Sequence, residues 1–237
     1  MEMKQRIDAI RTRVADTCKR CGRAPSEIRI IAVSKTKPVE AIRMAVEAGQ
    51  VAFGENYAQE LRDKAKELSG VEWHFIGRLQ KNKVKYVAPV ANWIHTVDSV
   101  DLIEAINKRL SNVPTYQRTN VLIEVNVAGE SAKSGIAPEK VFDLVQAFQA
   151  NQRTNEPTNT LALKGLMTMP PYSDNAEKSR PYFKKLRDLL NEINKRNIYP
   201  EKLTELSMGM SQDFEVAIEE GATMVRIGTA IFGFRQQ

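Results

Sequence analysis

The feature that most constrains the fold is an alternation of short apolar runs with amphipathic helical patterns along the 237 residues. Strand-like apolar runs occur at 28–34, 51–54, 72–76, 93–97, 120–127, 161–167, 203–206 and 223–227. Helical patterns lie between them, at about 39–48, 56–68, 80–87, 99–110, 138–149, 175–196 and 212–220, with a short one after 229. Such alternation predicts parallel strands that are joined by helical crossovers.

Eight such units in about 200 residues predict an α/β fold, namely a single (β/α)8 TIM barrel. Residues 3–20 carry a further amphipathic pattern, so we expect an N-terminal helix within 1–22 that packs on the barrel. We therefore expect one domain over residues 1–237. The alternative is an open doubly wound sheet, which usually needs a nucleotide-binding loop. Neither G-x-G-x-x-G nor G-x-x-x-x-G-K occurs in this chain.

Charge and hydropathy argue against several classes of protein. No apolar run approaches the roughly 18 residues of a membrane span, and residues 1–6 contain no apolar signal core, so we expect a cytoplasmic protein. The net charge of +6 is well mixed along the chain. Its densest basic stretch lacks the aromatic array of a nucleic-acid surface, although it would attract small anions; it contains Arg78, Lys81, Lys83 and Lys85.

The cysteines and histidines do not predict a metal site. Cys18 and Cys21 have C-x-x-C spacing, but a zinc site needs four ligands and no second pair exists. The pair closes a helical pattern instead of following a strand, unlike a thioredoxin-like motif. His74 and His95 lie on different predicted strands, with no third ligand indicated. We expect no bound metal and assign no role to the two thiols, which fit a reducing cytoplasm.

The first predicted strand ends abruptly in a lysine. The run from Ile30 to Ser34 precedes Lys35, and Pro38 then opens a helix. Desolvation at a buried strand end lowers the pKa of a lysine ammonium, and a neutral amine can form a Schiff base with an aldehyde. Lys37 would point the same way on a strand. The alternative is a lysine that simply extends from the strand end into solvent.

Glycine and hydroxyl residues gather after the last two predicted strands. Ser207 and Ser211 flank Gly209, and Gly228 and Thr229 precede a short helix. Barrel phosphate sites often use these two loops and a helix N-terminus, where backbone N–H groups and hydroxyls approach the phosphate. A phosphate site and an amine nucleophile on one face are what pyridoxal 5'-phosphate (PLP) requires. The alternative is that these are ordinary turn and capping residues.

Six motifs, in order along the chain, resemble the pyridoxal phosphate homeostasis protein family. They are AVSKTKP at 32–38, FGENYAQE at 53–60, WHFIGRLQKNK at 73–83, GLMTM at 165–169, LSMGMSQD at 206–213 and VRIGTAIFG at 225–233. The resemblance extends from about residue 28 to 233. That family is similar to the N-terminal barrel of alanine racemase and of bacterial-type ornithine decarboxylases, a fold III PLP-binding scaffold.

The resemblance implies specific roles at the site. It selects Lys35 over Lys37 as the residue that carries PLP as an internal aldimine, and it places Arg226 beside the pyridine nitrogen. The other contacts that it implies are Ser207, Ser211, Gly228 and Thr229 for the phosphate, and Asn56, His74 and Met167 for the pocket lining.

An arginine beside the ring nitrogen limits the chemistry that the resemblance would otherwise suggest. Its fixed positive charge opposes a pyridinium, so a carbanion next to the cofactor would be weakly stabilised and transamination is disfavoured. Racemisation also needs acid–base groups on both faces. In the resembling racemases the second base is a tyrosine from a C-terminal β domain, and this chain ends directly after the barrel.

We therefore expect a PLP-binding protein of intracellular vitamin B6 homeostasis and amino-acid balance that is not an enzyme and has little or no catalytic turnover. Two alternatives remain: a fold III PLP-dependent amino-acid racemase or lyase, and a PLP-responsive regulatory module that acts through a protein partner. Other B6 vitamers, amino acids and an acceptor protein are further expected partners. Without the β domain that pairs the racemases, we expect a monomer.

Overall fold

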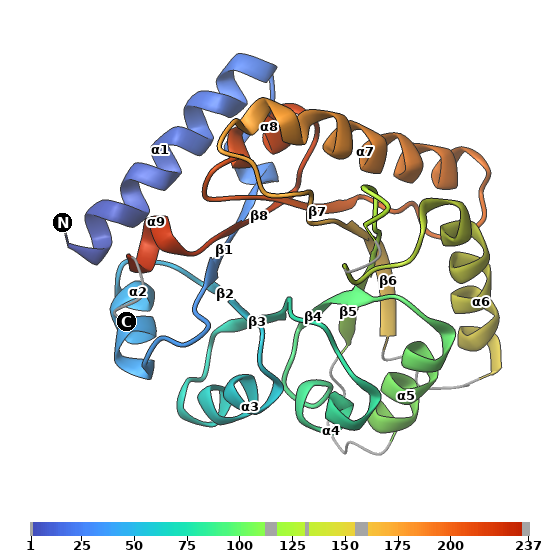
Figure 1. Ribbon diagram of the computed structural model, residues 1–237. Coiled ribbons are helices and arrows are strands. Elements are labelled where there is room, and N and C mark those ends of the chain that lie inside the picture. The colour runs from blue at the N-terminus through green and yellow to red at the C-terminus, as the bar shows by residue number, and fades with distance from the viewer. Residues whose placement is uncertain (1, 112–117, 131–132, 155–160, 234–237) are drawn as a thin grey trace.

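The computed structural model describes residues 2–111, 118–130, 133–154 and 161–233. Within these ranges eight parallel strands form a closed barrel in chain order, and the last strand pairs with the first (Figure 1). The strands are β1 Arg29–Val33, β2 Ala52–Glu55, β3 Glu72–Phe75, β4 Trp93–Val97, β5 Thr119–Glu124, β6 Leu161–Met167, β7 Glu205–Met210 and β8 Met224–Ile227. The prediction of an α/β TIM barrel is confirmed.

Helices surround the barrel and cover the outer faces of the strands (Figure 1). In α7, for example, Phe183, Leu186, Leu190 and Ile193 recur at helical spacing and are all buried. The helices of the ring are α2 Val39–Glu47, α3 Ala58–Glu67, α4 Val84–Val87, α5 Val100–Leu110, α6 Val141–Thr154, α7 Arg180–Lys195, α8 Phe214–Glu219 and α9 Thr229–Phe232. Short 3-10 turns are η1 Pro25–Glu27, η2 Lys81–Lys83, η3 Pro138–Lys140 and η4 Ala176–Ser179.

Strand β7 differs most from its predicted extent. The apolar run at 203–206 predicts an early end, because Ser207 and Gly209 resemble loop residues. In the structure the strand continues through Met210, where it pairs with Arg226 of β8. Parallel neighbours on both sides supply hydrogen-bond partners, and they override the weak local preference of serine and glycine. Ser207 consequently lies within the barrel wall and not in the loop that follows it.

The apolar core has two parts. A large layer lies between the strands and the surrounding helices and includes Phe53, Phe148 and Phe183, each fully buried. A small cluster fills part of the barrel interior and consists of Ile31, Ala52, Trp93, Leu122, Met167 and Met224. Side chains that point inward from parallel strands meet in this way in layers across a barrel. Several polar side chains are buried as well, and they belong to the site described below.

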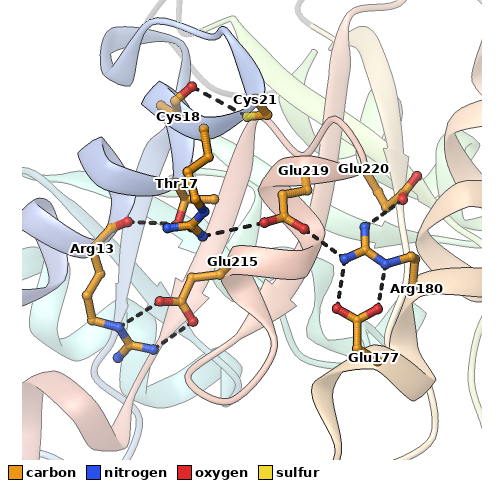
Figure 2. A network of polar contacts seen from close by, with 10 residues as sticks. Arg13, Thr17, Cys18, Cys21, Glu177, Arg180, Glu215, Glu219 and Glu220 are labelled. Atoms are coloured by element: carbon orange, nitrogen blue, oxygen red, sulfur yellow. Dashed lines mark hydrogen bonds and ion pairs between the residues drawn. The ribbon is translucent and has the colours of Figure 1, made fainter.

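The predicted N-terminal helix is α1, Met3–Cys21, which lies outside the barrel against α8 and α9 (Figure 1). Its buried face is Ile7, Ile10, Val14, Thr17 and Cys18. Ion pairs flank this face: Arg13 pairs with Glu215 of α8 (Figure 2), and Arg20 pairs with Glu219 of α8. Exposed pairs contribute about 0–1 kcal/mol each, so the apolar face supplies most of the attachment.

The structure also bears on membrane spans, on the two thiols and on metal binding. No helix in the described ranges is both long and apolar enough to cross a membrane. Both cysteines lie on α1, where Cys21 Sγ contacts the Cys18 carbonyl at 3.6 Å (Figure 2). Burial raises the pKa of the Cys18 thiol, which disfavours the reactive thiolate. No group of three or more His, Cys, Asp or Glu among the described residues is arranged to hold a metal ion.

Candidate functional site

A cavity of about 290 Å³ opens at the carboxyl ends of the strands, near the lower end of the usual size for a small-molecule site. This is the face where barrel enzymes and binding proteins place their chemistry. Six of the nine sequence-predicted site residues line it: Lys35, Asn56, Ser211, Arg226, Gly228 and Thr229. The structure therefore brings the predicted amine, the predicted phosphate loops and the predicted arginine together around one space.

Lys35 is held at the end of β1 by its neighbours in the chain. Thr36 adopts a left-handed conformation with φ of 62°, which a β-branched residue rarely takes. Its backbone N–H donates to Glu60 Oε1 at 2.6 Å, and Lys64 Nζ donates to the Ser34 carbonyl at 2.8 Å. Such a conformation is unfavourable by about 1–2 kcal/mol and persists where surrounding contacts fix it. Glu60 and Lys64 thus hold the backbone on both sides of Lys35.

Glu60 and Lys64 also belong to a buried ion cluster that was not predicted from the sequence. Lys64 is only 7% exposed, and its ammonium lies 2.8 Å from Glu55 Oε1 and 2.7 Å from Glu60 Oε1. The Ser34 hydroxyl also donates to Glu55 Oε1, at 2.6 Å. Burial raises the pKa of Glu55, and Lys64 and Ser34 partly offset this effect. The available signal was the Glu60–Lys64 spacing of four residues on one helix face.

The loops after β7 and β8 form another part of the cavity lining, and β8 is the barrel neighbour of β1. Ser211 Oγ accepts a hydrogen bond from the Gly228 backbone N–H at 3.3 Å, which joins the two loops. Gly209 has φ of +90°, and a Cβ there would lie 2.5 Å from the Cβ of Ala217. Glycine is therefore required for the strand to turn so closely into α8. Hydroxyls and glycine amides in this arrangement suit a phosphate group.

Arg226 places a buried cation beneath the cavity. Its Nη1 donates to the Ser207 carbonyl at 2.8 Å and to Ser207 Oγ at 2.6 Å, and its Nη2 donates to the Thr168 carbonyl at 2.8 Å. Burial lowers the pKa of Arg226 to about 10, while Asp213 and Glu124 oppose that change. The guanidinium therefore remains charged at neutral pH. Its neutral carbonyl and hydroxyl acceptors fix its orientation.

Three predicted site residues do not line the cavity, because their side chains lie within the barrel interior. Met167 packs in the small apolar cluster. His74 stacks on Trp93, with ring centroids 5.8 Å apart, and its Nδ1 lies 2.9 Å from His95 Nε2. All three are 0% exposed: His74, Met167 and Ser207. The expected contacts of His74 and Met167 with the cofactor stay a prediction.

The expected phosphate contact of Ser207 stays a prediction as well, and the structure places its side chain in the barrel interior. Its hydroxyl lies 2.9 Å from His95 Nδ1 and 2.6 Å from Arg226 Nη1, so both of its neighbours are side chains of the barrel interior. The physical reason is the extension of β7, which turns Ser207 inward. Ser211, four residues later, is the serine that this strand delivers to the cavity.

Six residues that line the cavity were not predicted. They are Val33, Ile76, Met169, Tyr172, Met210 and Gln212. Tyr172 donates its hydroxyl to Asp174 Oδ1 at 2.8 Å and accepts from Gln212 Nε2 at 3.1 Å, so the loops after β6 and β7 are joined across the opening. The rule that found Lys35 and Thr229, namely a position just beyond a strand end, would also have selected Tyr172 and Gln212.

Comparison with known proteins finds relatives over nearly the whole chain. The family model described as "Alanine racemase, N-terminal domain" matches residues 6–236. A pyridoxal phosphate homeostasis protein of Aquifex aeolicus is 45% identical over 238 residues, which cover 100% of both chains. PipY of Synechococcus elongatus, solved with PLP bound, is 30% identical with a TM-score of 0.79, and the match covers 98% of this chain and 100% of that one.

More distant matches bear on the fold alone. An alanine racemase of Corynebacterium glutamicum is 17% identical with a TM-score of 0.65, and the match covers 96% of this chain but 62% of that one. The barrel described here is thus similar to part of a larger enzyme. The full-length relatives and the matching family model decide the classification, and the chain belongs to the pyridoxal phosphate homeostasis protein family, within the barrel class of the alanine racemase N-terminal domain.

Proposed function

We propose that this protein binds PLP in the cavity, holds it as a Schiff base on Lys35, and serves intracellular PLP homeostasis and amino-acid balance. The observation that carries the proposal is that Lys35 lines the same cavity as Ser211, Gly228 and Thr229. The names of the relatives and the PLP-bound PipY structure support it. The relatives from Aquifex aeolicus and Escherichia coli, which match nearly the whole chain, are both named pyridoxal phosphate homeostasis protein.

The residues of the cavity fit the chemical groups of PLP. The bound cofactor supplies an aldehyde, and its condensation with the Lys35 amine releases one water molecule and is reversible. Ser211, Gly228 and Thr229 bind the phosphate through hydroxyls and backbone N–H groups. Arg226 presents its cation towards the ring nitrogen. The Thr36 turn keeps Lys35 directed into the cavity, because Glu60 fixes the backbone next to it.

We also propose that the protein binds and releases PLP with little or no catalytic turnover. Arg226 is charged at neutral pH and opposes protonation of the ring nitrogen, which weakens electron withdrawal. Among the described residues that line the cavity there is no carboxylate to promote that protonation. The geometry therefore favours a site that retains the cofactor over one that stabilises a carbanion. The naming of the relatives for homeostasis agrees.

Absorbance and chemical trapping test the proposal. Protein supplied with PLP should show a band at about 420 nm, and borohydride should fix the cofactor on the peptide that contains Lys35. Lys35→Ala should lose the band and the trapped peptide while it keeps its far-ultraviolet circular dichroism. Lys37→Ala is the matched control, because Lys37 Nζ lies near the carbonyls of Phe232 and Gly233. Trapping at Lys37 in the parent protein would contradict the proposal.

A fold III racemase is the second candidate, and one observation favours it. Tyr172 and Lys35 both line the cavity, so two acid–base groups are within the same site. The assay is the interconversion of L- and D-alanine by PLP-loaded protein. We expect no conversion above that of Lys35→Ala. Conversion that is lost in Tyr172→Phe, with PLP binding retained, would establish the racemase instead.

A further inference from the structure

A continuous line of polar side chains crosses the barrel interior below the cavity. Arg226 Nη1 lies 2.6 Å from Ser207 Oγ, which lies 2.9 Å from His95 Nδ1. His95 Nε2 lies 2.9 Å from His74 Nδ1, and His74 Nε2 lies 3.4 Å from Glu72 Oε1. The five residues come from β8, β7, β4 and β3. Binding of PLP as proposed above uses none of them except Arg226.

The arginine fixes the direction of hydrogen donation along this line. A guanidinium has only donors, so Ser207 Oγ must accept from Arg226. The hydroxyl oxygen can accept twice, but its hydrogen needs an acceptor, and His95 Nδ1 supplies one when it is the bare nitrogen of that ring. His95 carries its hydrogen on Nε2 and donates to His74 Nδ1. His74 in turn carries its hydrogen on Nε2, directed towards Glu72.

The far end of the line agrees with this direction. His74 Nε2 is buried and has no partner with hydrogen-bond geometry in the described ranges, but the Glu72 carboxylate faces it at 3.4 Å. Glu72 itself accepts from Trp93 Nε1 at 2.6 Å and lies 3.7 Å from Arg29 Nε. A carboxylate attracts an N–H and repels a bare nitrogen. The Nε2–H form of His74 is therefore favoured.

The reverse direction is disfavoured at both ends. It would place the bare nitrogen of His74 against the Glu72 carboxylate. It would also turn His95 Nδ1–H towards Ser207, whose hydroxyl hydrogen would then have no acceptor among the described residues, since Arg226 cannot accept. A buried donor without an acceptor is unfavourable by about 1–3 kcal/mol. Protonation of either ring is opposed by complete burial of both histidines.

We propose that Glu72, His74, His95 and Ser207 form a hydrogen-bonded chain with one direction of donation, in which both histidines are neutral Nε2–H tautomers, and that the chain positions the Arg226 guanidinium. Ser207 is the link, because it offers Arg226 both its carbonyl and its hydroxyl oxygen. His95 fixes the rotation of that hydroxyl, and so it determines which lone pair Arg226 meets. These four are positioning residues, and none of them is among the residues that line the cavity.

Histidine NMR tests the tautomers without any cofactor. The chain has two histidines, so nitrogen-15 spectra of their rings are simple to assign with single-histidine variants. In the cofactor-free protein we expect both rings to show a protonated Nε2 and an unprotonated Nδ1 at neutral pH. A protonated Nδ1 in either ring, or an imidazolium, would overturn the chain.

A serine pair extends this test. In Ser207→Ala the His95 Nδ1 signal should shift towards that of an unprotonated nitrogen that accepts no hydrogen bond, because its donor is gone. Ser179→Ala is the matched control, since Ser179 is also buried but bonds to Asp213 Oδ2. Equal shifts in the two variants would contradict a specific Ser207–His95 bond.

The positioning role is tested with bound PLP, and this part rests on the proposed function. We expect His95→Leu to weaken PLP binding at least threefold and to shift the absorbance maximum of the bound cofactor. His95→Gln, whose amide can still accept from Ser207, should restore both values towards those of the parent. Unchanged binding and spectrum in a folded His95→Leu would refute positioning. If the parent protein failed to bind PLP, the proposed function would fail while the NMR result stood alone.

Discussion

Lys64 holds the backbone next to Lys35 through buried polar contacts. Its buried ammonium contacts the Ser34 carbonyl, Glu55 and Glu60. Replacing it with methionine leaves the Glu55 carboxylate buried without its cation, and a broken buried pair typically destabilises by about 3–5 kcal/mol. We expect Lys64→Met to lower the free energy of unfolding by that order, as measured by urea denaturation followed by circular dichroism.

The same helix provides the control for this prediction. Lys66 is 67% exposed and pairs with Asp63 at 3.5 Å, so Lys66→Met should change the free energy of unfolding by less than about 1 kcal/mol. Adding Glu55→Leu to Lys64→Met should recover part of the lost stability, since it removes the unpaired carboxylate. Equal losses of unfolding free energy in Lys64→Met and Lys66→Met would show that the buried cluster does not stabilise the backbone around Lys35.

Residue types at strand ends, together with the family resemblance, predicted part of the cavity lining. Lys35, Gly228 and Thr229 stand next to strand ends, where local pattern indicates both the element and the position. Glu55 could not be predicted as a partner of Lys64, because that pairing depends on how α3 lies against β2. Ser207 was placed at the phosphate, but its side chain meets His95 and Arg226, which are far from it in the sequence.

At the scale of elements, the turn from β7 into α8 depends on Gly209. A Cβ at this position would lie 2.5 Å from the Ala217 Cβ and 2.9 Å from the Phe214 Cα, and the backbone has φ of +90°. Gly209→Ala should therefore combine steric overlap with backbone strain. We expect a loss of stability of about 2–4 kcal/mol, and weaker PLP binding because Ser211 is displaced from Gly228. Thermal unfolding and PLP titration measure the two effects.

Gly70 is the matched control for the backbone contribution. It has φ of +74°, and a Cβ added there would meet no other atom within 4 Å, so Gly70→Ala carries the strain without the overlap. Its expected loss is about 1 kcal/mol, with PLP binding unchanged. If Gly209→Ala and Gly70→Ala had equal effects on stability and PLP binding, the close packing of β7 on α8 would not explain the shape of the loop that carries Ser211.

At the scale of the whole molecule, the buried histidines make stability depend on pH. Burial lowers the pKa of His74, and that of His95 lies well below its ordinary value for the same reason, with the nearby His74 and Arg226 adding to the effect. In the unfolded chain each histidine binds a proton below about pH 6.5. Below that pH the unfolded state therefore binds more protons than the native state, and stability falls as pH falls.

We expect this loss to begin near pH 6.5 and to reach at most about 1.4 kcal/mol per pH unit for each histidine. Burial raises the pKa of Glu55 and Glu124, which has the opposite effect at lower pH. The measurement is therefore a comparison of urea unfolding between the parent and a double His74→Gln, His95→Gln variant. In the variant the free energy of unfolding should not show the fall below pH 6.5. Parallel plots of this free energy against pH for the parent and the variant would contradict the prediction.

The sequence by itself determined the barrel, the N-terminal helix and the positions of Lys35, Arg226 and the glycine at 228. Apolar periodicity is a local property, and it predicted each strand to within a few residues except at the end of β7. Parallel strands also bring all their carboxyl ends to one face, so strand-end residues could be grouped without coordinates.

Only the tertiary structure decided which polar side chains meet inside the barrel. The line from Glu72 through the two histidines and Ser207 to Arg226 joins the neighbouring strands β3 and β4 to the neighbouring strands β7 and β8, and these two pairs face each other only across the closed barrel. Its direction follows from the donors of Arg226 and from the register of four strands. No local pattern encodes that register, because it is set by packing across the whole interior.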